Sequence, residues 1–139
     1  MSQTSSQAGI TLIEMILVAA IIMMLAAVAV PSLLRTKQAA DSAVAIGQLR
    51  TMHTTQTMYK LRGSRFARLP DLNTFVENSL GTTVGSTIRH RSFTFLMSPT
   101  PTNSSLRTGY TIYAYRIEQG RVISFYRMSE MGAIETIIP

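Results

Sequence analysis

The strongest hydrophobic pattern in the chain is a continuous apolar segment near its N-terminus. Every residue from Met15 to Val30 is apolar, and the segment extends with few polar interruptions from Ile10 to Leu34. As an α-helix it would be about 37 Å long, whereas the hydrocarbon core of a bilayer is about 30 Å thick. A chain of 139 residues cannot bury a helix that is apolar on all sides, so the pattern predicts a membrane-spanning helix over residues 10–34.

The pattern of the following segment predicts that the helix continues outside the membrane. Residues 36–61 are rich in Ala, Gln, Leu and Met and contain no Pro, a composition that favours helix. Gln56 weakens the apolar face, and Gly63 is suited to end the helix. The residues expected on the buried face are Ala43, Ile46, Leu49, Met52 and Tyr59. We therefore expect a helical spine whose soluble half covers residues 35–62.

The C-terminal part of the chain has the alternation and turn residues of a small sheet. Residues 65–85 are punctuated by Gly, Pro and Asn, and predict a connecting loop with a short helix over 72–80. Strands are expected over residues 92–97, 110–117, 121–128 and 133–138. A three-residue link at 118–120 indicates a hairpin. The fold class that follows is α+β, with a small antiparallel sheet of three or four strands packed on the helical spine.

The composition removes several classes of function. The chain has no Cys, which excludes disulfides, thiol nucleophiles, thiolate zinc sites and iron–sulfur clusters. Its seven acidic residues are scattered, so we expect no metal site. His53 and His90 lie far apart in sequence, and each is expected on a surface or a helix face. Without a P-loop, a Gly-x-Ser-x-Gly string or an HExxH motif, we expect no cofactor and no enzymatic activity.

Three kinds of N-terminal segment fit the apolar helix. The first is a removable secretory signal, for which Ala27 to Ala29 offer a small-residue cleavage site. The second is a plain membrane anchor. The third is a signal that is cut before the helix, so that the helix stays with the mature protein. The residues from Met1 to Gly9 include no Lys or Arg, whereas a secretory signal begins with positive charge. Glu14 is costly in a membrane helix unless it has a partner, although Thr11 and Glu14 also fit a capping box. These features favour retention of the helix.

One motif resembles that of a known protein family. The string Gly9-Ile10-Thr11-Leu12-Ile13-Glu14, followed by the apolar run and Pro31, resembles the prepilin signature of type IV pilins and of the pseudopilins of type II secretion. The resemblance implies a pilin fold, cleavage between Gly9 and Ile10 by a prepilin peptidase, and N-methylation of Ile10. The parts of the chain are then a leader that is removed (1–9), a transmembrane and assembly helix (10–34), the soluble half of the spine (35–62) and a globular region (63–139).

The chemistry of the cleaved terminus gives Glu14 a specific role. Cleavage creates a charged amine at Ile10, at the head of an apolar helix, where an unpaired charge is costly. We expect Glu14 of a neighbouring subunit to neutralise that amine and to fix the axial register of the assembly. Pro31 either ends the membrane helix or kinks a helix that continues. The helix-forming sequence beyond Pro31 favours a kink with a role in assembly.

The basic residues form two clusters in the sequence. They are Arg62, Arg65 and Arg68, with Lys60 adjacent, and, separately, Arg89 and Arg91. The formal net charge of +6 is consistent with an anionic partner. Such clusters can contact a nucleic-acid backbone, with an affinity that falls as salt rises. Solvated faces and subunit interfaces are the more common use of such clusters, so nucleic acid is the less favoured partner.

These features together predict a structural, non-enzymatic subunit of a type IV pilus-like filament. The resemblance implies, as partners, other copies or related pilins, a prepilin peptidase and an inner-membrane assembly platform, and the apolar helix implies membrane lipid before assembly. The expected location is the bacterial inner membrane, with a single span, and afterwards an extracellular or periplasm-spanning filament. The alternatives are a pseudopilin of a type II secretion system and, less favoured, a secreted binding module behind an ordinary signal peptide.

Overall fold

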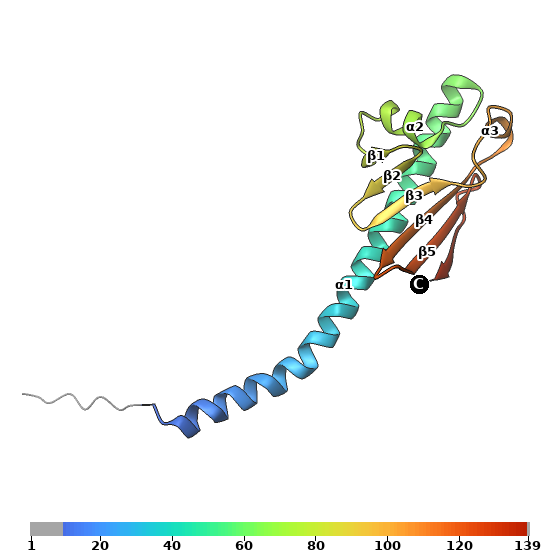
Figure 1. The fold of residues 1–139 in the computed structure, drawn as a ribbon. Helices are drawn as coiled ribbons and strands as arrows, with labels where there is room; N and C mark the ends of the chain where they lie inside the picture. Colours follow the sequence, from blue (N-terminus) through green and yellow to red (C-terminus); the bar gives the residue numbers. More distant parts are fainter. Residues whose placement is uncertain (1–9, 139) are drawn as a thin grey trace, which may run out of the picture. The chain divides into compact units, whose positions relative to one another are not determined.

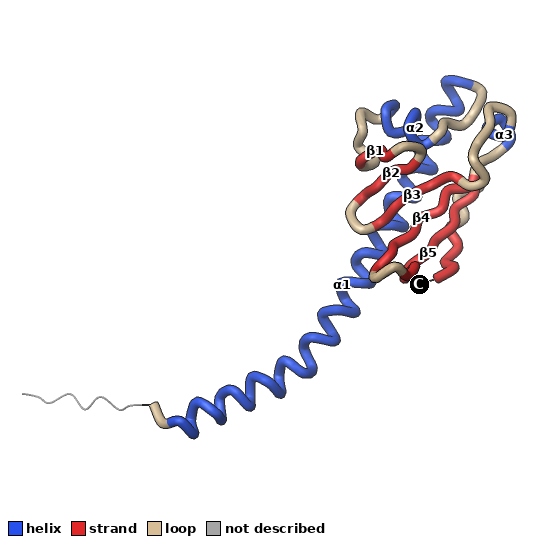
Figure 2. Tube along the Cα trace, viewed as in Figure 1, coloured by secondary structure: helices blue, strands red, loops and turns tan. Residues whose placement is uncertain are grey.

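The computed structural model describes residues 10–138, whose arrangement is drawn in Figures 1 and 2. The elements, in chain order, are α1 (Leu12–Gly63), α2 (Leu69–Phe75), β1 (Thr82–Val84), β2 (Thr87–His90), β3 (Phe93–Met97), α3 (Ser105–Thr108), β4 (Thr111–Glu118), β5 (Arg121–Ser129) and β6 (Ile134–Ile138). The strands form one six-stranded antiparallel sheet in which each strand pairs with the next along the chain. The predicted α+β class is confirmed.

The chain divides into two compact units, Met1–Ala39 and Ala40–Pro139. The helix α1 crosses the boundary between them as a continuous helix of 52 residues. In the first unit every described residue is exposed except Ala19, which is half-buried. Because apolar side chains are driven out of water, this part of α1 requires an apolar environment that the described part of its own unit does not supply.

The core of the second unit lies between α1 and one face of the sheet, which α1 crosses in Figure 1. The strands supply alternate residues to it, as a half-covered antiparallel sheet does. The fully or almost fully buried apolar side chains from α1 and the strands are Ala45, Leu49, Met52, Ile88, Phe93, Phe95, Ile112, Ala114, Tyr126 and Met128. The sheet and the second half of α1 therefore share one core.

The predicted buried face of α1 is correct at Leu49 and Met52, which are fully buried, and at Ile46 and Tyr59, which pack partly buried against the core. It differs at one position. Ala43 is exposed and Ala45 is buried instead. Gln56, which was expected to weaken this face, is fully buried. Its Oε1 accepts the N–H of Ala67 and its Nε2 donates to the carbonyl of Ala67, each at 2.8 Å. The side chain can be buried because its polar atoms are hydrogen-bonded. A prediction based on the positions of apolar residues does not detect such hydrogen bonds.

The sheet has more strands than the sequence predicted: β1 falls in the segment expected to be a loop, and β2 lies between that segment and the first predicted strand. All residues of β1 are exposed, and Ile88 is the buried residue of β2. Strands this short have too few residues to show alternation. A tight turn at Gly85, which has a φ of 59°, joins β1 to β2. The sequence predicted a loop at this Gly, whereas it forms a hairpin turn.

The predicted helix over residues 72–80 is shifted: α2 spans Leu69–Phe75. Pro70 lies in its first turn, where the missing N–H costs nothing because no carbonyl precedes it in the helix. The helix then ends before Glu77 and Asn78, which adopt left-handed φ values of 54° and 62°. The prediction took Pro70 as a break before the helix, whereas the structure uses it as a start.

The hairpin between β4 and β5 forms as predicted, with a tighter turn. Glu118 pairs with Arg121 and so belongs to β4. The remaining residues, Gln119 and Gly120, have φ values of 51° and 76°. Positive φ at both central residues is the signature of a two-residue turn whose twist matches that of the strands.

Candidate functional site

The first turn of α1 is capped by Thr11. Its carbonyl accepts the N–H groups of Glu14 and Met15 at 3.1 and 3.2 Å, and its Oγ1 accepts the Glu14 N–H at 3.3 Å. These bonds satisfy donors that a helix start otherwise leaves unpaired. Within residues 10–138, the carboxylate of Glu14 takes part in no ion pair.

The apolar part of α1 is long and apolar enough to cross a bilayer, and its most apolar window is not buried by the described residues. Ile10, the first described residue, has 67% of its surface exposed. Gly9 lies outside the described residues, so cleavage between Gly9 and Ile10 and methylation of Ile10 stay predictions. The segment thus presents an apolar surface that lipid or other helices have to cover.

Pro31 lies inside α1, and the helix continues beyond it to Gly63. This excludes the alternative in which Pro31 ends the membrane helix. Pro31 has no N–H to donate to the carbonyl of Ala27, and one turn later the hydroxyl of Thr36 donates to the carbonyl of Ser32 at 3.0 Å. The helix therefore carries an intrinsic weak point in its hydrogen-bond ladder at this position.

The structure brings together two of the predicted basic residues. Arg65 and Arg68 both donate to the same oxygen, Oδ1 of Asn103, with Nη1 of Arg65 at 2.7 Å and Nη2 of Arg68 at 3.2 Å. Asn103 is far away in the sequence, in the loop before α3. These residues form a small cationic site whose only acceptor, within the described residues, is neutral.

The other predicted basic residues have separate environments. The Arg62 guanidinium lies over the Phe75 ring at 4.9 Å, and Lys60 Nζ lies over the Phe66 ring at 4.2 Å. Arg89 is an exposed residue of β2, and Arg91 is exposed in the turn after it, with a φ of 54°. The second sequence cluster is therefore ordinary exposed charge, without a shared acceptor in the part of the chain that the structure describes.

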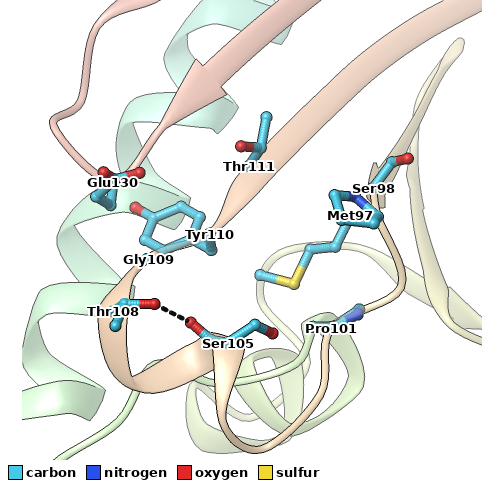
Figure 3. Close-up of a pocket in the computed structure, with 10 residues that line it drawn as sticks. Met97, Ser98, Pro101, Ser105, Thr108, Gly109, Tyr110, Thr111 and Glu130 are labelled. Carbon is cyan, nitrogen blue, oxygen red and sulfur yellow. Dashed lines mark hydrogen bonds between the residues drawn. The ribbon is translucent and has the colours of Figure 1, made fainter.

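A pocket of about 250 Å³ lies beside the start of β4. In Figure 3, Tyr110 and Glu130 line one side of it, and Met97 and Pro101 line the other. The Tyr110 hydroxyl is 2.9 Å from Nδ1 of His53, on α1. The prediction of a helix-face position for His53 holds, but its side chain is half-buried and tied to the sheet.

The electrostatics of this pocket keep Tyr110 protonated. Burial, and to a lesser extent the nearby Glu130 carboxylate, raise the pKa of the Tyr110 hydroxyl well above its usual range, because both disfavour the phenolate. A hydroxyl of this kind is a hydrogen-bond donor, not a nucleophile or a base at neutral pH. No group of three or more His, Asp or Glu side chains that could hold a metal comes together within residues 10–138.

An ion pair that sequence reasoning missed links α1 to the sheet. Arg116 Nη1 on β4 lies 2.6 Å from Asp41 Oδ2, and the two side chains are 6% and 21% exposed. Arg116 Nε is buried and has no hydrogen-bond partner among the described residues. The signal was present in the alternation of β4, since Ile112, Ala114 and Arg116 share the inward face. The sequence did not indicate that Asp41 is the partner of Arg116, because the two residues are distant in sequence.

The comparisons with known proteins concern the N-terminal segment. Among curated proteins, none has a sequence that matches this chain. Residues 4–30 match the Prokaryotic N-terminal methylation motif. The matched range contains the string Gly9 to Glu14 and almost the whole apolar run of α1. Together with the exposed apolar helix and the antiparallel sheet, the match shows that the chain carries a type IV pilin-like prepilin signal.

Proposed function

We propose that this chain is a structural subunit of a type IV pilus-like filament. The observation that carries the proposal is the methylation motif at residues 4–30 on a helix whose apolar surface is left exposed. Membrane lipid covers that surface in the inner-membrane precursor, and the same segment of neighbouring subunits covers it after assembly. A prepilin peptidase cuts the precursor between Gly9 and Ile10 before assembly, so that the helix stays with the mature protein.

The proposed role of Glu14 follows from charge and from the geometry of the helix start. The new amine at Ile10 stands at the head of an apolar helix, where its charge needs a partner. Within one helix, the backbone at Glu14 is already engaged in the cap made by Thr11. The carboxylate of Glu14 from a neighbouring copy neutralises the amine at one axial stagger only, so the pair specifies register more than it adds stability.

The first test is the N-terminus of the mature protein. Mass spectrometry of the protein purified from membranes or filaments is expected to give a chain that begins at Ile10 with a methylated amine. A start after Ala29 would mean that an ordinary secretory signal is removed, and would contradict the proposal. An uncleaved chain that begins at Met1 would identify a plain membrane anchor and would contradict it equally.

The second test separates assembly from insertion. Glu14→Gln keeps the size of the side chain and removes its charge, so we expect normal membrane levels and processing with a loss of filaments seen by electron microscopy. Thr11→Val is the matched control, since it removes the capping hydroxyl and leaves the carboxylate in place. Filaments at normal levels in the Glu14→Gln strain would contradict the register role.

The same signal occurs in pseudopilins, which act in type II secretion, and the two roles have different consequences for the cell. Loss of surface filaments on deletion of this chain is the result expected of a pilus subunit. A block in protein export with surface filaments retained would instead assign the chain to a secretion pseudopilus. Both results keep the processing and assembly chemistry described above.

A further inference from the structure

Arg65, Arg68 and Asn103 form a site in which two cations meet at one uncharged oxygen. Their distances to Asn103 Oδ1, 2.7 and 3.2 Å, bring both guanidinium groups to the same point. Two like charges repel at such a separation, and an amide oxygen offsets that repulsion far less than an anion does. The arrangement is therefore electrostatically incomplete.

The backbone that carries the two arginines is fixed in place. Between them lie Phe66 and Ala67, both buried. The N–H of Phe66 donates to the carbonyl of Leu106 at 2.8 Å. The N–H and the carbonyl of Ala67 are both hydrogen-bonded to the side chain of Gln56. A ligand at this site thus meets cations that are already positioned, which lowers the ordering cost of binding.

Two more basic residues belong to the segments that contact Phe66, the residue next to Arg65. Lys60 lies over the Phe66 ring, and Arg107 directly follows Leu106, whose carbonyl binds Phe66. We name Lys60, Arg65, Arg68 and Arg107, with Asn103, the basic corner. Within residues 10–138, the ion pairs are those of Arg116 and Arg127 with their carboxylates, so no cation of the basic corner is neutralised.

A second copy of this chain would have to bind the basic corner through its own carboxylates. Of its acidic residues, Asp41, Glu118 and Glu135 already face arginines. The other acidic residues of the globular unit are separate: Asp71 lies in α2, Glu77 follows it, and Glu130 lines the pocket beside β4. An anion that carries several charges in a row complements the clustered cations better than these separate carboxylates do, which favours another kind of molecule.

We propose that the basic corner binds the phosphate groups of an extended polyanion, a phosphodiester or polyphosphate chain. One phosphate lies between Arg65 and Arg68 in contact with both guanidinium groups, whose planar fork matches a phosphate bidentately. Lys60 and Arg107 contact the flanking phosphates. The aromatic rings nearby are not free to stack on bases, since Phe66 is 7% exposed and Phe75 lies under Arg62. Recognition is therefore of the phosphate chain and not of a base sequence.

The test uses the full chain in a non-ionic detergent and measures fluorescence anisotropy of labelled oligothymidylate, with inorganic polyphosphate as an unlabelled competitor. The double variant Arg65→Gln/Arg68→Gln is expected to bind about tenfold more weakly and to lower the salt dependence by about two phosphate contacts. Arg89→Gln/Arg91→Gln is the matched control, because it removes the same charge from exposed positions without a shared acceptor. Equal losses in both double variants would show that net charge alone attracts the polyanion, and would overturn the proposal.

A third variant separates the site from the total charge. Asn103→Asp leaves all four cations in place and puts a carboxylate between Arg65 and Arg68. The expected result is a loss of binding close to that of the arginine double variant, with an unchanged or raised melting temperature. Unchanged binding in Asn103→Asp would overturn the proposal. Competition by polyphosphate as strong as that by unlabelled oligothymidylate identifies the phosphate chain as the ligand, whereas a failure of polyphosphate to compete would overturn recognition through phosphate alone.

Discussion

The Gln56 side chain holds both backbone polar groups of Ala67 inside the core of the globular unit. Removing it in Gln56→Ala leaves a buried N–H and a buried carbonyl without partners. Each unpaired group costs about 1–3 kcal/mol, so for the two groups together we expect the free energy of unfolding to fall by about 2–6 kcal/mol. Denaturant unfolding of the full chain in detergent, followed by circular dichroism, measures this change.

Gln48→Ala is the matched control for that prediction. Gln48 also lies on α1, is half-buried, and donates one hydrogen bond, to the carbonyl of Leu80 at 2.8 Å. Its loss is expected to cost about 1 kcal/mol. Equal costs for the two variants would mean that Ala67 finds other partners once Gln56 is gone, and would contradict the role given to Gln56.

The Tyr110 hydroxyl makes stability depend on pH in the alkaline range. Burial first, and Glu130 second, raise the pKa of Tyr110 in the folded protein, while in the unfolded chain it ionises near its ordinary value of about 10. Below that pH both states are neutral and the full stability is present. As pH rises above it, the unfolded state releases a proton that the folded state retains, so stability is lost.

Unfolding free energies measured at pH 8 and pH 11 are expected to show this loss. Tyr110→Phe keeps the ring and removes the ionisable group, so its stability should fall less over the same interval, although it starts lower because the bond to His53 is gone. The other tyrosines are common to both proteins and cancel in the comparison. Parallel curves for the two proteins would contradict the assignment to Tyr110.

The sequence identified most of the cations of the site but not the residue that organises them. Arg65 and Arg68 stood out as neighbours in sequence, whereas Asn103 follows Arg65 by 38 positions, in the loop before α3. Loop polar residues are common, and neither charge nor periodicity marks the one that will face a given arginine. Such long-range pairings become visible only when the fold brings the segments together.

At the scale of elements, the ion pair of Asp41 and Arg116 connects α1, near the start of the second unit, to β4. Asp41→Ala leaves the buried Arg116 with only the exposed Glu118 carboxylate, which lies 3.9 Å from its Nε. Because breaking a buried ion pair by removing one partner is strongly destabilising, we expect a cost of about 3 kcal/mol. The double variant Asp41→Ala/Arg116→Met should recover much of that loss, since it removes the unpaired charge as well.

The exposed pair of Arg127 and Glu135 provides the comparison for this experiment. Both side chains are about half exposed, and exposed pairs contribute at most about 1 kcal/mol. Arg127→Met is therefore expected to shift the denaturation midpoint only slightly. A cost for Asp41→Ala as small as that for Arg127→Met would show that water already screens the pair on α1.

The elements that the sequence predicted well are those with long, regular patterns. The helix α1 shows a long apolar run followed by a helix-favouring composition, and β4 and β5 show alternation over eight and nine residues. The short strands β1 and β2 do not, and they depend on a side chain elsewhere. Asn73 Nδ2 donates to the carbonyl of Gly81 and to the hydroxyl of Thr83 at 2.8 Å, and its Oδ1 accepts the N–H of Leu80. Tertiary contacts of this kind override weak local preference.

At the scale of the whole molecule, the two units have different requirements for stability. The first has an exposed apolar surface, and the second has its own core, drawn from residues 45 onward. The sequence showed this contrast directly, because the continuous apolar run and the alternating strands are different patterns. The sequence did not show the boundary between the two units, which lies between Ala39 and Ala40, because α1 continues through that point.

A fragment of residues 40–139 is therefore expected to fold without detergent as a monomer. It keeps every residue of the core cluster and the pair of Asp41 and Arg116, and it loses only the segment whose apolar surface needs lipid or other subunits. Its melting temperature should lie within about 4 °C of that of the full chain in detergent, a difference of under 1 kcal/mol for a domain of this size. Circular dichroism and sedimentation velocity make the comparison. If the fragment unfolds or aggregates, the first unit contributes to the stability of the second, and the globular part depends on the helix that anchors it.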